Sequence, residues 1–199
     1  MKNRQWLLDV GRPDGAIQDS DFNFVETDAP TPGVGEVLVR NLMLSCDPTQ
    51  RGWIARGTYL PVVKIGEVVR SIGAGRIVAS NNSDFSVGDI VSGLTGWQDY
   101  VAMNPKGQLN KLPPGAQLEL AMGVLGLNGV TAYFGLLDVG RPIAGETIVV
   151  SGAAGATGSV VGQIAKIKGY FGVALIVGAV MSSAFLRGEI ESAGPDVVR

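Results

Sequence analysis

A glycine-rich turn in the last third of the chain is the stretch whose residue types and spacing best suit chemistry. Small residues let the backbone approach a diphosphate, and the free N–H groups at a helix start favour its negative charge. The G-x-x-G-x-x-G spacing departs from the G-x-G-x-x-G of a dinucleotide fingerprint, so an ordinary tight turn stays open as the alternative. We predict a dinucleotide-phosphate site whose contacts are Gly152, Ala154, Gly155, Ala156, Thr157 and Gly158.

The composition excludes several kinds of site. The chain has no histidine among its 199 residues, which excludes histidine-based triads, general bases and zinc sites, and we expect no metal ion. The single cysteine, Cys46, cannot form an intrachain disulfide, so we expect a reducing compartment, the cytoplasm. Because no base is available to activate it, Cys46 is expected to be a packed, inert thiol.

The charge balance argues against one class of partner. Lys and Arg number 16 and Asp and Glu number 18, for a net charge of −2, and the sequence has no basic stripe. We therefore expect no nucleic-acid partner.

The elements before the turn fall into two parts that meet near residue 118. The earlier part reads as short strands separated by Gly and Pro turns, which predicts a small β-barrel or sandwich. Its strand-like runs are residues 6–8, 22–25, 36–44, 75–80, 90–92, 98–103 and 109–115.

The later part shows helical periodicity. Residues 118–127 and 130–139 are predicted helices, with Asn128-Gly129 as a break between them and Gly140-Arg141-Pro142 as the stop of the second. We place a domain boundary near residue 125, between domains of residues 1–125 and 126–199.

A βαβ unit is predicted around the glycine-rich turn. Residues 146–151 read as a buried strand and residues 159–168 as a helix. Gly158 and Gly162 are expected to allow close helix–strand packing. The inward-facing positions of the helix are predicted to be Val160, Val161, Ile164 and Ile167.

Several motifs, taken in order, resemble those of one protein family. The chain is similar to the zinc-independent medium-chain dehydrogenase/reductases, and within them to the NADPH-dependent prostaglandin, alkenal double-bond and curcumin reductases. The resemblance covers residues 1–169. Its motifs are Leu44-Ser45-Cys46-Asp47-Pro48, Arg51-Gly52-Trp53, Asp84-Phe85-Ser86-Val87-Gly88-Asp89, Gly96-Trp97-Gln98-Asp99-Tyr100 and the stretches 129–140 and 145–169.

This resemblance implies a fold and an activity. The fold is α/β with a β-barrel: a GroES-like β-barrel domain followed by a Rossmann domain with a parallel sheet. The activity is an oxidoreductase reaction, in which NADPH delivers a hydride to the β-carbon of a small enone or enal and the α-carbon takes up a proton. The family also implies a homodimer formed through the edge of the Rossmann sheet.

Four residues are candidates for this chemistry beside the turn. Tyr59, Arg51 and Tyr100 are the catalytic candidates, as groups that could orient the substrate carbonyl, and Thr131 lies on the helix that in the family passes near the nicotinamide. A loop anchor, an ion-pair partner and a packed strand residue stay open as the respective alternatives for the first three. Thr49 stands where some relatives have a pocket tyrosine.

The last part of the chain departs from the family. Residues 170–186 carry no charge, so the residue that would select a ribose hydroxyl or a 2′-phosphate is missing there. Three explanations stay open: a chain cut short or altered, a reduced Rossmann half with residues 170–177 as its second strand, and a membrane segment at 169–186. We favour an incomplete Rossmann domain and expect no membrane span.

The sequence is therefore consistent with two functions. The first is NADPH-dependent reduction of the activated C=C bond of an α,β-unsaturated aldehyde or ketone. The alternative is a truncated, catalytically inactive family member that acts at most as an interaction module.

Overall fold

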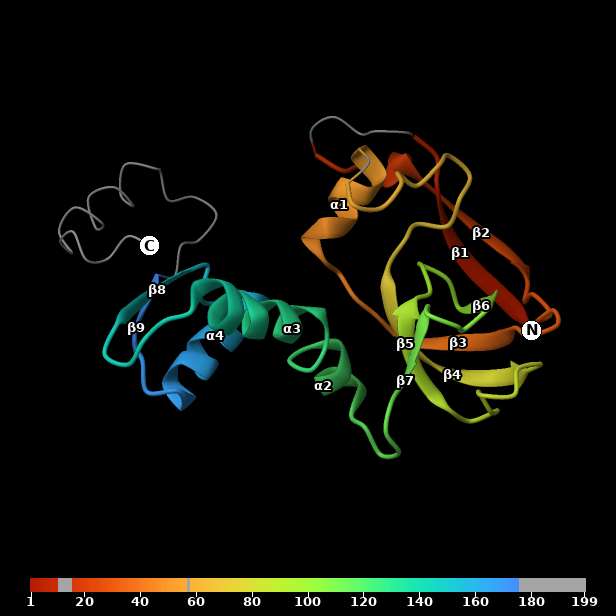
Figure 1. The fold of residues 1–199 in the computed structure, drawn as a ribbon. Coiled ribbons are helices and arrows are strands. Elements are labelled where there is room, and N and C mark those ends of the chain that lie inside the picture. Colours follow the sequence, from red (N-terminus) through yellow and green to blue (C-terminus); the bar gives the residue numbers. More distant parts are fainter. Residues whose placement is uncertain (11–15, 57, 176–199) are drawn as a thin grey trace. The chain divides into compact units, whose positions relative to one another are not determined.

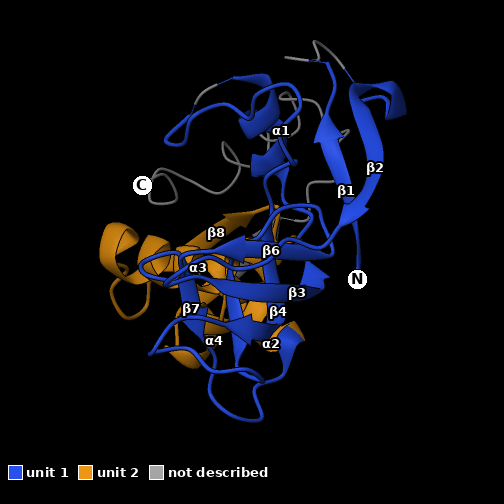
Figure 2. Ribbon diagram, turned by 90° about the vertical axis from the view of Figure 1, so that its right-hand side faces the viewer, with its two compact units in different colours: residues 1–118 blue, residues 119–199 orange. Residues whose placement is uncertain are grey.

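The computed structural model describes residues 1–10, 16–56 and 58–175. The chain divides into two compact units, Met1–Leu118 and Glu119–Arg199, which Figure 2 shows in blue and orange. Antiparallel strands dominate the first unit, whereas the second combines helices with a pair of parallel strands (Figure 1). The domain boundary near residue 125 stays a prediction.

A hairpin opens the first unit. Strand β1 (Lys2–Leu8) pairs antiparallel with β2 (Phe22–Asp28), which follows the short 3-10 helix η1 (Asp19–Asp21). The predicted apolar runs at 6–8 and 22–25 lie in these two strands. Isolated bridges from β1 to Gln98 and Val68 tie the hairpin to the rest of the unit.

A five-stranded antiparallel sheet forms the centre of the first unit. Its strand order is β6-β3-β4-β5-β7. The predicted strands are confirmed except that the last one ends at Lys111 and not at residue 115. Their buried apolar residues include a core of Val37, Val39, Ile77, Val91 and Leu109. Closure of these strands into a barrel stays a prediction. The strands are β3 (Val37–Leu44), β4 (Ile72–Ser80), β5 (Ile90–Leu94), β6 (Tyr100–Met103) and β7 (Leu109–Lys111).

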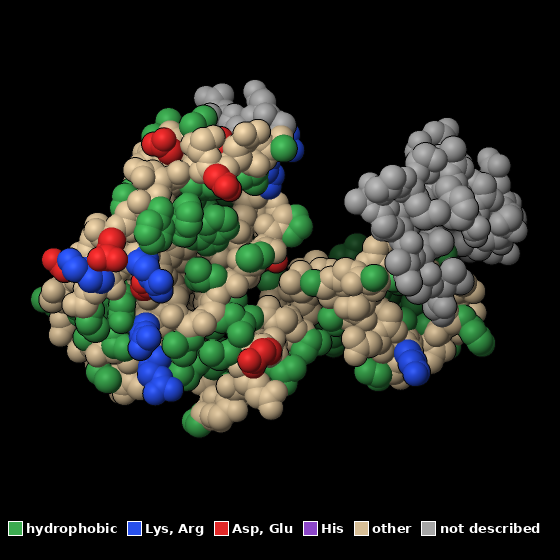
Figure 3. Space-filling view, turned by 180° about the vertical axis from the view of Figure 1, so that it is seen from behind, with side chains coloured by type: hydrophobic (Ala, Val, Ile, Leu, Met, Phe, Trp, Pro, Cys, Tyr) green, Lys and Arg blue, Asp and Glu red, His purple; other side chains and the backbone are tan. Residues whose placement is uncertain are grey.

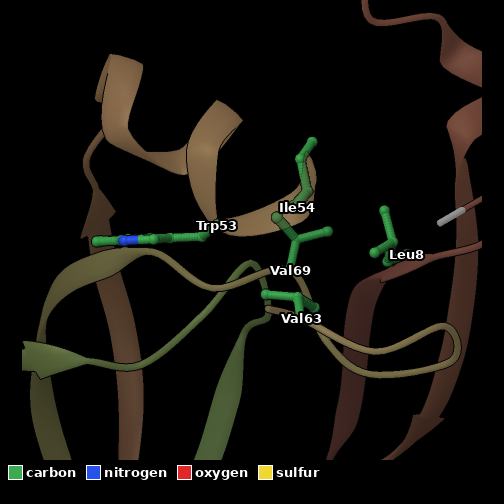
Figure 4. Close-up of a cluster of buried hydrophobic side chains, with 5 residues drawn as sticks. All are labelled: Leu8, Trp53, Ile54, Val63 and Val69. Carbon is green, nitrogen blue, oxygen red and sulfur yellow. The ribbon is translucent and has the colours of Figure 1, made fainter. Parts of the chain in front are cut away.

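Helix α1 (Pro48–Ala55) packs on a second core within the same unit. Pro48 opens the helix, where its missing N–H costs no hydrogen bond. Figure 4 shows Trp53 and Ile54 of α1 beside the other buried side chains of this core, which are Leu8, Val63 and Val69.

The helices around residues 118–140 differ from the prediction. Helix α2 (Leu118–Met122) is short, and α3 (Leu127–Phe134) contains Asn128-Gly129, so the predicted break at that dipeptide is wrong. A Cβ built at Gly129 would lie 1.6 Å from the carbonyl oxygen of Val124. Glycine is therefore needed there so that the preceding turn can fold back against α3.

The predicted end of the second helix at Gly140-Arg141-Pro142 is confirmed. The π-helix η2 (Gly135–Gly140) continues α3 and ends at Arg141, whose φ of 47° is left-handed. The Arg141 Nε group donates a hydrogen bond of 2.6 Å to the carbonyl oxygen of Asp138. Pro142 follows, as the sequence predicts for a helix end.

A βαβ unit closes the described part of the chain. Strand β8 (Thr147–Ser151), helix α4 (Ala156–Ile167) and β9 (Phe171–Leu175) follow one another, and the two strands pair in parallel. Helix α4 contacts both strands and α3 (Figure 1). The predicted strand and the predicted βαβ opening are confirmed, and the helix begins three residues earlier than predicted.

One detail of this unit corrects the prediction and another agrees with it. Val160 is buried, but Ile167 is 82% exposed, so the expected inward orientation of Ile167 is wrong. Both lie on one stripe of α4, and no described element covers the stripe at its C-terminal end. Strand β9 matches the predicted second strand up to Leu175, and residues 176–177 lie outside the described residues.

The membrane alternative falls mostly outside the described chain. No helix among the described residues combines the length and the apolar character needed to cross a membrane. Residues 176–186 of that predicted segment lie beyond them.

Candidate functional site

The glycine-rich turn joins β8 to α4 and is held by its own backbone. Gly152 has a φ of 61°, which favours glycine. The Gly155 N–H donates to the Gly152 carbonyl oxygen at 2.8 Å, and Gly155 is the residue that caps α4. The turn is therefore closed and compact.

Gly158 explains how closely the turn and the helix approach. A Cβ at this position would lie 2.4 Å from the Gly152 carbonyl oxygen and 2.9 Å from the Ala153 Cα. Glycine is thus required for the first turn of α4 to lie against the loop. No described atom lies within 4 Å of a Cβ at Gly162, so the close packing expected at that residue is wrong.

The start of α4 presents unpaired backbone donors. The first N–H groups of a helix have no carbonyl within the helix. Among the described residues, no backbone carbonyl accepts from Ala156, Thr157 or Gly158, whereas Ser159 donates to the Gly155 carbonyl at 2.9 Å. These donors, together with the positive end of the helix dipole, can hold a diphosphate.

One side-chain hydrogen bond reaches this turn from α3. The Thr157 hydroxyl donates to Asn128 Oδ1 at 2.9 Å. Sequence reasoning missed Asn128, because Asn128-Gly129 was interpreted as a helix break. Thr131 lies one turn further along α3 and is exposed.

The structure thus gathers the predicted phosphate contacts in one place. Gly152 and residues 154–158 form the turn and the first residues of α4, and α3, which carries Thr131, packs against α4. The positions that follow β9, where a ribose-selecting side chain is expected, lie outside the described residues. The described residues therefore fit the diphosphate of a dinucleotide.

The three catalytic candidates lie in the first unit on different elements. Arg51 is on α1, Tyr59 follows that helix on a loop, and Tyr100 begins β6. Tyr59 is 73% exposed, and its ring meets Trp53 edge-on with 6.3 Å between ring centroids. No hydrogen bond or ring contact of the described residues joins Tyr59 to Tyr100.

Two hydrogen bonds with the Asn3 side chain fix the backbone of Tyr100. Its N–H donates to Asn3 Oδ1 at 2.9 Å, and Asn3 Nδ2 donates back to the Tyr100 carbonyl oxygen at 2.9 Å. Asn3 is only 1% exposed. Tyr100 is therefore anchored by the hairpin strand β1.

Two features that sequence reasoning missed support the Tyr59 loop. Arg70 Nη1 donates to the Pro61 carbonyl oxygen at 2.7 Å, and the Arg70 guanidinium lies 5.9 Å from the Trp53 ring centroid. Trp53 is 2% exposed. A single packed tryptophan therefore contacts both the loop tyrosine and the arginine that binds the loop backbone.

A buried polar network holds the corner between β3 and α1. Gln50 Nε2 donates to the Ser45 carbonyl oxygen at 2.7 Å and to Ser71 Oγ at 3.1 Å. Ser71 Oγ lies 3.0 Å from the same Ser45 oxygen, and Ser45 Oγ donates to Asp47. This network sets the direction in which α1 leaves the sheet.

Cys46 in this corner corrects another expectation. The thiol is exposed, so the predicted packed thiol is wrong. The apolar run of β3 ends at Leu44, and Cys46 follows it in the turn that leads to α1. Among the described residues, no group of three or more His, Cys, Asp or Glu side chains could hold a metal ion.

Side chains of the Gly96–Tyr100 motif form hydrogen bonds with side chains of strand β1. Arg4 Nε and Nη2 donate to the two carboxylate oxygens of Asp99 at 2.8 and 3.1 Å. Gln5 Nε2 donates to Gln98 Oε1 at 2.8 Å. The hydrogen bond from Arg4 is the main reason that the pKa of Asp99 lies below its ordinary value.

The chain matches known proteins over most of its length. Residues 4–112 match a family described as the N-terminal domain of oxidoreductase. The chain is 45% identical over 170 residues to the NADPH-dependent curcumin reductase of Escherichia coli (strain K12), over 84% of this chain and 49% of that protein. It is 43% identical over 162 residues to prostaglandin reductase 1 of Mus musculus, over 78% of this chain and 46% of that protein.

A solved structure agrees with these relatives. The crystal structure of CurA from Vibrio vulnificus in complex with NADPH matches with a TM-score of 0.79 and 41% identity, over 86% of this chain and 51% of that chain. The chain spans about half the length of the curated relatives it matches. The chain belongs to the zinc-independent medium-chain dehydrogenase/reductase family and carries its oxidoreductase N-terminal domain at residues 4–112.

Proposed function

We propose that this chain binds NADPH and reduces the activated C=C bond of an α,β-unsaturated aldehyde or ketone. The observation that carries the proposal is the closed turn between β8 and α4, with its glycine contact at Gly158 and its unpaired N–H groups. The family membership and the NADPH named for two of its relatives support the same cofactor.

We propose that the two units correspond to the two domains of this family. The antiparallel strands of residues 1–118 support a GroES-like β-barrel domain, for which we propose the bounds 1–125. The β8–α4–β9 unit supports an incomplete Rossmann domain at residues 126–199. In open parallel sheets ligands bind outside the carboxyl ends of the strands, where Ser151 and Leu175 lie side by side.

The cofactor's diphosphate would be held by Gly152, Gly155 and the N–H groups of residues 156–158, with Ala154 lining the turn. Thr131 on α3 is proposed as a further contact. When bound, NADPH supplies the hydride for the β-carbon of the substrate, and the α-carbon takes up a proton.

Residues of the first unit are proposed to handle the substrate. Negative charge develops on the carbonyl oxygen as the hydride arrives, and a hydrogen-bond donor aimed at that oxygen stabilises it. Tyr59 is the first choice, because its exposed ring is held by Trp53 and its hydroxyl makes no hydrogen bond to the described residues. Arg51 and Tyr100 are proposed to orient the same substrate.

The test is consumption of NADPH by the purified chain, followed by its absorbance after addition of an enal or an enone. The proposal predicts oxidation of NADPH that depends on the added substrate and yields the saturated carbonyl compound. Absence of product with every enal and enone tried, while NADPH still binds, would contradict the reductase activity.

The inactive interaction module remains a second candidate because of one observation. Val139, Ile167 and Phe171 of the second unit are 80%, 82% and 70% exposed, and Figure 3 shows hydrophobic side chains at the surface of this unit.

We also propose a homodimer, from the family, and a location in the cytoplasm, from the single cysteine. Light scattering of the purified chain would detect the dimer.

A further inference from the structure

A hydrogen bond between two helices reaches the proposed phosphate site. Thr157 is the second residue of α4, Asn128 is the second residue of α3, and the Thr157 hydroxyl donates to Asn128 Oδ1 at 2.9 Å. Among the described residues, no other side-chain hydrogen bond joins these helices. Both side chains are half-buried, so water competes only in part for this bond.

We propose that Asn128 is a positioning residue for the phosphate-binding turn, and that its amide can both accept from and donate to the Thr157 hydroxyl. This inference rests on the proposed binding of NADPH. Helix ends fray, and unpaired N–H groups bind an anion best when they are already held in place. The bond from α3 holds the first turn of α4 through the Thr157 side chain.

The backbone alone does not supply this restraint. Gly158 and the Gly155–Gly152 hydrogen bond keep α4 against its own loop. No neighbouring group among the described residues lies within 4 Å of a Cβ at Gly152, so there is open space beside the loop at that residue. Among the described residues, the Asn128–Thr157 bond is the one side-chain hydrogen bond that adds to the packing of α3 against α4.

The chemistry of the two groups explains why an amide is suited to this place. A hydroxyl has one hydrogen, so Thr157 cannot donate to Asn128 and to a phosphate oxygen at once. Rotation of the Asn128 amide by half a turn would present Nδ2 to Thr157 Oγ1 and release the hydroxyl hydrogen to a phosphate. Among the described residues Nδ2 has no acceptor of its own, so this rotation breaks no second bond.

The experiment compares NADPH binding by calorimetry in the full chain and in variants of this pair. Asn128→Ala and Thr157→Val each remove the bond and are expected to raise Kd about threefold to tenfold. The double variant is expected to bind no more weakly than the weaker single variant, because both changes remove one interaction. Thr157→Ser retains the hydroxyl and is expected to bind NADPH with a Kd close to that of the wild type.

Two further variants sharpen the test. Gln163→Ala is the matched control, because within the described chain the Gln163 amide donates only to the Ser159 carbonyl oxygen of its own helix. The Kd of this variant is expected to equal that of the wild type. Asn128→Asp can only accept while ionised, which keeps the Thr157 hydroxyl turned away from phosphate. It is expected to bind more weakly than Asn128→Ala, even at raised salt that screens the added charge.

A readout without nucleotide separates positioning from general stability. Hydrogen exchange of the Ser159 amide is expected to speed up in Asn128→Ala, while the midpoint of thermal unfolding falls equally in Asn128→Ala and Thr157→Val. Tight NADPH binding by the wild type with unchanged Kd in Asn128→Ala would overturn the positioning role alone. An Asn128→Asp affinity equal to that of Asn128→Ala would overturn the rotating amide. No NADPH binding by the wild type would overturn both this inference and the proposed function.

Discussion

At the residue scale, the proposed cofactor site depends on backbone groups and on the absence of side chains. Gly152 provides a left-handed φ, and Gly158 provides a contact that no larger residue permits. The proposed site therefore depends on glycines whose replacement would strain the backbone, as at Gly152, or cause a clash, as at Gly158.

Gly158→Ala is expected to disrupt the turn. Its Cβ would lie 2.4 Å from the Gly152 carbonyl oxygen, and no rotamer change can relieve this clash, because the backbone fixes the positions of both atoms. We expect NADPH affinity to be lost and the free energy of unfolding to fall by about 1–3 kcal/mol, measured by calorimetry and by urea unfolding. Gly162→Ala is the control: its Cβ meets open space within α4, and stability should rise by up to about 1 kcal/mol. Equal behaviour of the two variants would contradict the role of Gly158.

Tyr59→Phe is expected to lower kcat while leaving the fold intact. Removal of one donor to a developing oxyanion lowers kcat on the order of a hundredfold. The exposed hydroxyl has no hydrogen bond to the described residues, so the unfolding midpoint should not move. Tyr133→Phe on α3, half-exposed like its neighbour Phe134, is the matched control in the same NADPH assay. An unchanged kcat in Tyr59→Phe would remove Tyr59 from the proposed mechanism.

Asp99→Asn is expected to destabilise the chain only where Asp99 is ionised. The hydrogen bond from Arg4 lowers the pKa of Asp99 in the folded state. The stability that ionised Asp99 gives to the folded state is therefore fully present above the unfolded pKa of about 3.9. It is lost as the pH falls through the lower pKa of the folded state. The variant should unfold at a lower temperature than the wild type at neutral pH, and the two midpoints should converge in acid. A constant difference at every pH would show that the charge plays no part.

At the element scale, the corner between β3 and α1 decides where Arg51 and the Tyr59 loop lie. Its polar network is buried: Gln50 is 7% exposed and Ser71 is fully buried. Buried hydrogen bonds of this kind are costly to leave unpaired. The direction of α1 therefore depends on a few side chains rather than on the helix itself.

Gln50→Leu is expected to weaken this corner. It removes the donor to the Ser45 carbonyl oxygen and to Ser71 Oγ, and should lower the free energy of unfolding by about 1–3 kcal/mol. Urea unfolding measures the change, with Thr49→Ala as the control at the exposed neighbouring position of α1. Similar stability of the two variants would show that the network contributes little.

The sequence predicted those elements whose signals are local. Strand β3 is a run of mostly apolar residues between turn signals, and the β8–turn–α4 order follows from a buried run, small residues and helical periodicity. Asn128-Gly129 misled the prediction because the same dipeptide serves turns and, here, a close contact with Val124. The Asn128–Thr157 bond and the contact of Arg70 with Trp53 join positions far apart in the sequence, and periodicity carries no information about such pairs.

At the scale of the whole molecule, the two units differ in how many of their apolar side chains are buried. The first has two apolar cores, whereas the described part of the second exposes Val139, Ile167 and Phe171. A parallel sheet is normally covered on both faces. We therefore expect the first unit to be the more stable part. Cofactor binding by the second unit is the central claim.

A calorimetric titration of the purified 199-residue chain with NADPH, and separately with NADH, tests that claim most directly. It requires no assumption about the substrate. We predict saturable binding with a micromolar Kd, tighter for NADPH than for NADH, and loss of that binding in Gly158→Ala. Absence of binding up to millimolar NADPH would contradict the proposed function and leave the interaction module as the remaining interpretation.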